Sequence, residues 1–242
     1  MRYLVISDIH GNLTAFQTVL KDAEGDWDFV WCLGDVVGYG PDPNECVALL
    51  REQPHICLSG NHDWAVLGRL DLSTFNPDAR NAIAWAQGVL SDESRAYLEA
   101  LPSKLVEDPF TLAHASPRQP VWEYIIDRYT ALANFEYLDT QYCLVGHTHV
   151  PIVFEELSAD EVMTHGPVYQ QPLPLNGARL IINPGSVGQP RDHDPRAAYA
   201  ILDTDQMTWE HRRVAYAIAE TQERMSDYDL PYRLIARLDY GL

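Results

Sequence analysis

Leu33-Gly34-Asp35-Val36-Val37-Gly38 is the stretch around which the chain is organised, because an apolar run ends there at one carboxylate between glycines. The run before it, Phe29-Val30-Trp31-Cys32-Leu33, predicts a strand of a parallel sheet that is covered on both faces. The two glycines allow the backbone to turn sharply after the strand. Asp35 is therefore expected at the carboxyl end of a buried strand, where open α/β sheets bind their ligands.

Other short stretches have the same composition, and each follows an apolar run and supplies Asp, Asn or His. They are Ser7-Asp8-Ile9-His10-Gly11-Asn12, Ser59-Gly60-Asn61-His62-Asp63, Ala113-His114-Ala115-Ser116 and Val145-Gly146-His147-Thr148-His149. Singly, each polar side chain could cap a helix, close a turn or be a satisfied buried group. Five of the nine histidines nevertheless lie in these stretches, a concentration that chance placement does not explain. Together the stretches predict one polynuclear metal centre.

The available ligands determine which metals such a centre could hold. Carboxylate, amide and imidazole groups without thiolate suit divalent ions such as Mn²⁺, Fe²⁺, Ni²⁺ or Zn²⁺. They suffice for two ions if one carboxylate bridges. Asp8 and His10 are two residues apart, as are His147 and His149. In an extended or turning segment this spacing presents both side chains to one side, so each pair is expected to converge.

Composition and charge limit the partners of the protein. The 242 residues include 35 acidic but only 17 basic ones, a net charge of -18, and no basic cluster is present. This surface would repel extended DNA or RNA, whereas a small phosphorylated substrate could bind beside divalent cations. The sequence shows no membrane span and no secretory signal, so a cytoplasmic location is expected. It leaves the oligomeric state open. Reduced, buried thiols are expected at Cys32, Cys46, Cys57 and Cys143.

The order of predicted elements indicates a mixed α/β fold. Strands are expected at 3–7, 29–33, 55–58, 104–107, 110–113, 142–145, 151–156, 162–164, 178–182, 197–202 and 207–214, and helices at 13–25, 44–52, 76–90, 91–101, 130–138, 215–225 and 232–238. The predicted architecture is one domain over 1–242 with two mixed sheets packed as a sandwich, helices outside, in αββα layers. The site is expected where both sheets end. Loops at 38–43, 64–75 and 117–127 are expected to set specificity, and 167–177 is expected to be a surface loop.

Five motifs of this chain resemble those of the calcineurin-like metallophosphoesterase superfamily and occur in the same order. The superfamily motifs are D-x-H, G-D-x-x, G-N-H-[DE], H and G-H-x-H. In this chain they are Asp8-Ile9-His10, Gly34-Asp35-Val36-Val37-Gly38, Gly60-Asn61-His62-Asp63, His114 and Gly146-His147-Thr148-His149. The resemblance implies two metal sites that share Asp35 as a bridge. One site would be completed by Asp8, His10 and His149, and the other by Asn61, His114 and His147.

The resemblance also implies an activity. His62 would protonate the leaving oxygen or steady the developing charge, and Asp63 would orient its ring. A hydroxide bridging the two metals would attack small phosphodiesters, nucleotides or phosphomonoesters, because metal binding lowers the pKa of water to about 7. A different class remains open, a catalytically silent metal-binding scaffold or sensor that acts through a protein partner. The intact pair of His62 and Asp63 disfavours this alternative, because a protein that only binds a partner does not need a general acid.

Two departures separate this chain from the serine/threonine protein phosphatase branch of the superfamily. That branch typically has Arg in the motif after its bridging Asp and Glu at the end of the third motif. Here the corresponding residues are Val37-Gly38-Tyr39 and Asp63. The chain looks more like the compact bacterial and archaeal phosphodiesterase branch, and its run at 183–192 resembles a stretch found there.

Several residues outside the motifs could contact substrate. Arg191 is a candidate for a bidentate phosphate contact, with a salt bridge to Asp192 or Asp194 as the alternative. Arg118 is a second substrate-binding candidate, and Tyr39 could line the pocket. The aromatic residues of the neighbouring loop are expected to pack in the core or at an interface. They are Trp122, Tyr124 and Tyr129.

Overall fold

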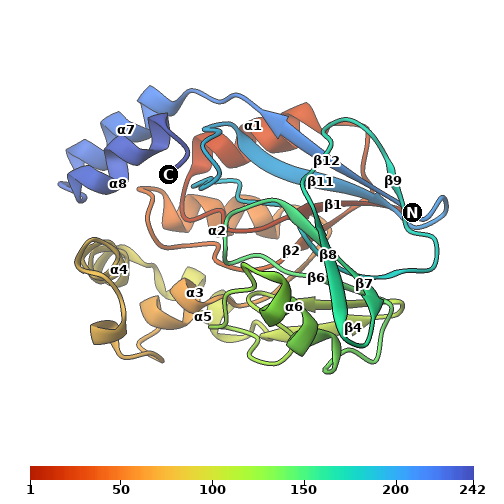
Figure 1. Ribbon diagram of the computed structural model, residues 1–242. Coiled ribbons are helices and arrows are strands. Elements are labelled where there is room, and N and C mark those ends of the chain that lie inside the picture. Colours follow the sequence, from red (N-terminus) through yellow and green to blue (C-terminus); the bar gives the residue numbers. More distant parts are fainter.

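The amino-terminal part of the chain forms two successive βαβ crossovers (Figure 1). A computed structural model describes all 242 residues. Its first three strands pair in parallel in the order β3-β2-β1, and each is joined to the next by a helix. The Asn12 side chain begins the first helix by accepting the N–H of Ala15. These elements are β1 (Arg2–Ile6), α1 (Leu13–Asp22), β2 (Phe29–Cys32), α2 (Pro43–Arg51) and β3 (His55–Cys57).

Strands from the carboxyl-terminal half complete this first sheet. β11 (Ala197–Asp203) pairs antiparallel with β1, and β12 (Thr208–Val214) pairs antiparallel with β11. β9 (Leu173–Pro174) lies at the edge, so the strand order is β3-β2-β1-β11-β12-β9. The loop expected at 167–177 therefore contains a short edge strand, because 173 and 174 pair with β12. The first sheet is built from both ends of the chain.

The second sheet is formed entirely by the middle of the chain. Its order is β4-β5-β6-β10-β7-β8, with β5, β6 and β10 mutually parallel and antiparallel strands at both edges. The strands are β4 (Lys104–Glu107), β5 (Phe110–Ala113), β6 (Tyr142–Leu144), β7 (Ile152–Ser158), β8 (Glu161–His165) and β10 (Arg179–Asn183). Two mixed sheets with helices outside confirm the predicted fold class.

The remaining helices surround the sheets. They are α3 (Asn61–Val66), α4 (Pro77–Val89), α5 (Asp92–Glu99), α6 (Arg128–Phe135), α7 (Ile218–Asp227) and α8 (Tyr232–Ala236), with short 3-10 turns at η1 (Leu72–Thr74) and η2 (Arg237–Asp239). The segment expected as a loop at 64–75 is thus partly helical. The reason is local, since Asp63 accepts the N–H of Gly60 and so caps the amino end of α3. None of the helices is both long and apolar enough to cross a membrane.

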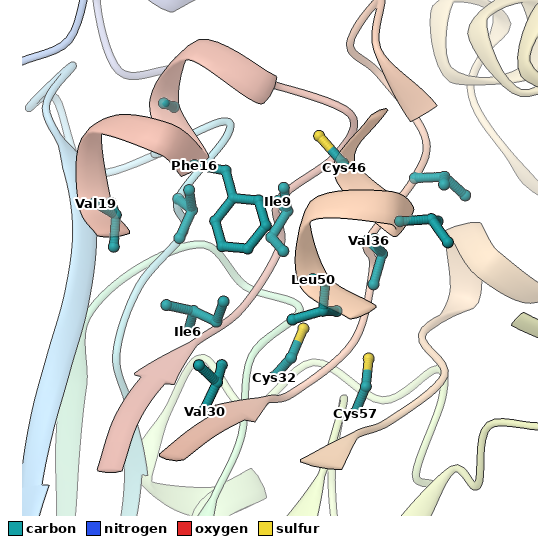
Figure 2. Close-up of a cluster of buried hydrophobic side chains, with 14 of the residues drawn as sticks. Ile6, Ile9, Phe16, Val19, Val30, Cys32, Val36, Cys46, Leu50 and Cys57 are labelled. Carbon is teal, nitrogen blue, oxygen red and sulfur yellow. The ribbon is translucent and has the colours of Figure 1, made fainter. Parts of the chain in front are cut away.

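Alternate side chains of the central strands divide between two layers of core. Figure 2 shows Ile6 and Val30 packed with Phe16 of α1 and Leu50 of α2 on the outer face of the first sheet. On the inner face, side chains from both sheets form a second cluster that includes Val5, Trp31, Phe110, Leu144 and Ile182. The strands are therefore covered on both faces, as their continuous apolar runs predict. The cysteines are free and buried at 32, 46, 57 and 143.

Candidate metal centre

The loops that follow β1, β2, β5 and β6 are tied together by backbone hydrogen bonds. Asp8 donates its N–H to Gly34 O (3.0 Å), and His10 donates to Asp35 O (2.9 Å). The two sheets are joined where the N–H of His147 donates to Asp8 Oδ2 at 3.0 Å. The N–H of Gly146 donates to His114 O at 2.7 Å and joins the loops after β5 and β6. Because the carboxyl ends of these strands meet at one edge, their polar residues are brought together, as the sequence predicts.

Most of the candidate ligands have left-handed backbone conformations. The φ angles are 55° at Asp8, 49° at His10, 54° at Asp35, 63° at His147 and 62° at His149. For residues other than glycine this conformation costs roughly 1–2 kcal/mol each. The paired ligands thus converge through tight turns, which is the turning alternative of the two geometries that their spacing allows. Strained backbone of this kind is concentrated at functional sites, where surrounding hydrogen bonds maintain it.

One group of ligands contains Asp8, His10 and His149, whose ligand atoms all lie within 4.8 Å of one another. Asp8 Oδ1 is 3.3 Å from His149 Nε2, and His10 Nε2 is 3.1 Å from His149 Nε2. All these side chains are buried. They form a compact set of one carboxylate and two imidazoles.

A second group contains Asp35, His114 and His147 within the same limit of 4.8 Å. Asn61 joins it, since its Oδ1 lies 3.3 Å from His114 Nε2. The Oδ2 atom of Asp35 is 3.4 Å from His114 Nε2 and 3.6 Å from His10 Nε2. One oxygen atom therefore faces both groups, which is the placement that a bridging ligand requires.

The buried polar atoms of the cluster fit divalent cations. Asp8 Oδ1, Asp35 Oδ2 and His147 Nε2 are buried without a hydrogen-bond partner. An ionised oxygen left unpaired in the protein interior costs roughly several kcal/mol of folding free energy. Metal ions bound between these oxygens and the imidazole nitrogens would compensate this charge. Candidate ligand clusters are present, as expected of a metal-dependent protein.

Two histidines are oriented by the backbone so that Nε2 faces the cluster. The Nδ1–H of His114 donates to Leu33 O at 3.0 Å, and that of His149 donates to Gln189 O at 2.5 Å. A carbonyl can only accept, so Nδ1 carries a proton in both rings and Nε2 is the nitrogen that would face a metal. Burial also lowers the pKa of His10, His147 and His149 well below that of free imidazole. These rings are therefore neutral, which is the form that ligates metals.

The prediction that Asp63 orients the His62 ring is wrong. The Asp63 carboxylate accepts backbone N–H groups from Asp35 and Gly60, both at 2.9 Å, and from Val37 at 3.2 Å. Both carboxylate oxygens of Asp63 therefore accept hydrogen bonds from the backbone. Asp63 therefore fixes the turn that presents Asp35, because it is the third residue of α3 and faces the β2 loop.

His62 is held by aromatic contacts, and its Nδ1 is buried without a partner. Its ring centroid lies 4.3 Å from that of Tyr39, 4.7 Å from His10 and 5.4 Å from Phe75. Gly38 passes so close that a Cβ atom there would come within 2.7 Å of His62 Nδ1. His62 lies beside the cluster, and Tyr39 lines the same space.

Of the two candidate arginines, only Arg191 faces the cluster. Its Nη2 donates to Tyr39 OH at 3.2 Å and to Gln189 Oε1 at 3.0 Å, and its Nε is buried without a partner. The alternative of a salt bridge to its neighbours is wrong, because Asp192 pairs with Arg213 and Asp194 pairs with Arg196.

Arg118 is held in an ion pair with Glu123. This pair uses its guanidinium, so the geometry favours a structural role over the substrate contact predicted from the sequence. Two aromatic residues of the same loop and one at the start of α6 are not in the core. Trp122, Tyr124 and Tyr129 are 40%, 47% and 69% exposed, and the Tyr124 ring lies 3.9 Å from that of His147. No pattern in the sequence marks Tyr124, since its position depends on how the loop closes.

Two stacked mixed sheets with a buried Asp, Asn and His cluster at their common edge define the class as a metallophosphoesterase. The chain belongs to the calcineurin-like phosphoesterase superfamily, because the model of that superfamily's domain matches residues 1–207. Members of this family depend on metals and act on phosphoester substrates, so the chain is assigned to the hydrolases.

Three proteins are similar to this chain over nearly its whole length. An uncharacterized protein of Methanocaldococcus jannaschii is 38% identical over 243 residues, covering 98% of this chain and 97% of the relative. The crystal structure of a metallophosphoesterase from Sphaerobacter thermophilus is 49% identical with a TM-score of 0.92, covering 100% of this chain and 99% of that one. A hypothetical protein from Pyrococcus horikoshii shares the fold, with 19% identity, a TM-score of 0.81 and coverage of 100% and 98%.

Proposed function

We propose that this protein is a dinuclear metal-dependent phosphoesterase that hydrolyses small phosphodiesters, nucleotides or phosphomonoesters. One observation carries the proposal. A single oxygen, Asp35 Oδ2, lies 3.6 Å from His10 and 3.4 Å from His114, and so faces both ligand groups at once. A mononuclear site would not need two sets of ligands next to one carboxylate oxygen. The net charge of -18 disfavours extended nucleic acid as substrate.

The side chains around the cluster would divide the chemical work. Asp8, His10 and His149 would hold one ion, Asn61, His114 and His147 the other, and Asp35 both. When bound, the ions would supply a nucleophilic hydroxide and neutralise the phosphoryl oxygens. Burial lowers the pKa of His62 to about 4, so the negative charge of a bound phosphoester would have to raise that pKa for His62 to transfer a proton to the leaving oxygen.

Arg191 would bind a phosphoryl oxygen on the side of the cluster where Tyr39 lies. Its guanidinium lies 5.6 Å from the centroid of the Tyr39 ring and forms no ion pair with any carboxylate. In a protein with such an excess of acidic residues, an arginine without a carboxylate partner beside a metal cluster has a charge available for an anionic ligand.

Replacing Arg191 with lysine should raise KM for a phosphoester about tenfold or more while changing kcat less. Lysine keeps the charge but loses the planar fork that binds two oxygens. Steady-state kinetics of the metal-loaded protein would measure both constants. Arg196→Met is the matched control, because that exposed arginine of the same segment pairs with Asp194. An unchanged KM in Arg191→Lys would remove this residue from the substrate site.

The proposal as a whole is tested by removing and restoring metal. Protein stripped with a chelator should be inactive towards bis-p-nitrophenyl phosphate, and Mn²⁺ or Ni²⁺ should restore release of nitrophenolate, because these ions supply the nucleophile. Metal content and turnover should be measured on the same sample. Two bound ions without turnover on any small phosphoester would favour the silent scaffold or sensor, and activity that survives stripping would contradict a metal-dependent enzyme.

A further inference from the structure

Three aromatic side chains lie next to the cluster, and we call this set the aromatic wall: Phe75, Trp122 and Tyr124. The rings of Phe75 and Trp122 are 5.2 Å apart in an edge-to-face arrangement. Phe75 also contacts the His62 ring at 5.4 Å, and Tyr124 covers the His147 ring at 3.9 Å. The wall therefore extends from the proposed proton donor to a proposed metal ligand.

The wall is exposed although it is apolar. Trp122 and Tyr124 are 40% and 47% exposed, whereas Phe75 is half-buried against the core formed by α4 and the C-terminal helices. Large aromatic side chains contribute much hydrophobic free energy when they are buried. Exposed clusters of them therefore commonly mark binding surfaces. The wall residues come from two separate loops, after α3 and after β5, which meet where Phe75 contacts Trp122.

A hydrogen-bond network fixes the loop that carries two of the wall residues. Glu123, between Trp122 and Tyr124, accepts hydrogen bonds from Ser116 Oγ at 2.7 Å and Asn134 Nδ2 at 2.8 Å. The same carboxylate pairs with Arg118. The rings are thus positioned before any ligand arrives, which lowers the conformational entropy lost on binding. This network also gives Arg118 a role that does not require contact with substrate.

The wall and Arg191 have complementary chemistry. Arg191 packs on Tyr39, whose ring also contacts that of His62, and Arg191 carries the positive charge. The wall carries none. A phosphoester bound at the cluster would place its phosphoryl oxygens near the cations and Arg191, and its remaining group could lie along the wall.

We infer that the aromatic wall stacks against a planar aromatic group of the substrate, so that nucleobase-bearing phosphoesters are preferred over sugar or alkyl phosphoesters. This inference rests on the proposed function of the cluster. Stacking of a base on aromatic side chains contributes about 1–3 kcal/mol per base and tolerates any base. The wall would therefore select for a base or aryl group without selecting strongly among bases.

The test compares ligands that differ only in the base. Calorimetry on the metal-loaded protein, with phosphonate analogues that cannot be hydrolysed in place of each ester, should give a Kd for the adenosine 5′-monophosphate analogue at least about fivefold lower than for the ribose 5-phosphate analogue. Trp122→Leu should remove most of that difference, and Tyr232→Leu, which alters a 79% exposed tyrosine outside the wall, should leave it unchanged. Phenyl phosphate, compared with glycerol phosphate, shows whether a simple aryl group is enough.

Because binding is measured without turnover, this test is separate from that of the proposed function. The inference would be overturned if the nucleotide and the ribose phosphate bound with equal affinity. It would also be overturned if Trp122→Leu weakened the binding of both equally, even if the enzyme hydrolyses phosphoesters. A preference for the nucleotide that Trp122→Leu abolishes would support it even if hydrolysis were never observed.

Discussion

Asp35→Asn protein should lose most of its bound metal and at least about a thousandfold of its turnover. Asparagine has nearly the same shape, so the change removes the charge and not the packing. Asp35 Oδ2 faces both ligand groups, and its Oδ1 accepts the N–H of His62 at 2.8 Å. Removing the one carboxylate that could serve both ions should therefore weaken binding of both.

Elemental analysis after dialysis against metal-free buffer would measure this loss, alongside turnover on the same preparation. Asp42→Asn is the control, because Asp42 is also a buried carboxylate but is paired with Arg224 outside the cluster. The control should retain its metal. Full occupancy of two ions in Asp35→Asn would refute the bridging role.

His62→Ala protein should retain its metal while its turnover falls about 10²–10⁴-fold, the range typical of losing a general acid. The His62 ring touches Tyr39 and His10, and its Nδ1 has no partner. One ligand atom of His62 also lies within 4.8 Å of atoms of His10 and Asp35. Metal content therefore decides between a proton donor and a ligand.

The companion variant Asp63→Ala should behave differently. Asp63 accepts the backbone N–H groups of Asp35 and Val37, so its loss should loosen the bridging turn and weaken metal affinity about 10–100-fold. Metal titrations of both variants by calorimetry would separate these effects. Equal loss of metal from His62→Ala and Asp63→Ala would contradict the roles proposed here.

Much of the site was predictable because the relevant signals are local. Apolar runs that end in Asp, Asn or His mark strands whose carboxyl ends share an edge, and parallel pairing of β1, β2 and β3 brings those ends together. The order of the five motifs then indicated the superfamily that the comparisons confirm. The number and identity of the metals, the catalytic roles and a cytoplasmic location stay predictions.

Other features depend on contacts between distant segments and could not be read locally. The sequence placed Asp63 beside His62, but its carboxylate is used by backbone groups of the preceding loop at 35 and 37. It predicted Trp122 and Tyr124 in the core or at an interface, and both are exposed, while Glu123 between them binds Ser116 and Asn134.

Residue order alone established the mixed α/β class, the edge of the sheets where the polar groups gather and the identity of the candidate ligands, because alternation and strand ends are properties of neighbouring residues. The tertiary structure decided how the side chains of these candidate ligands are oriented. The left-handed turns at Asp8, His10 and Asp35 persist only because hydrogen bonds from other loops maintain them. The free charge of Arg191 likewise exists only because Arg213 and Arg196 engage the neighbouring carboxylates. Such competition between distant partners for one charge or one hydrogen bond leaves no trace in any short stretch of sequence.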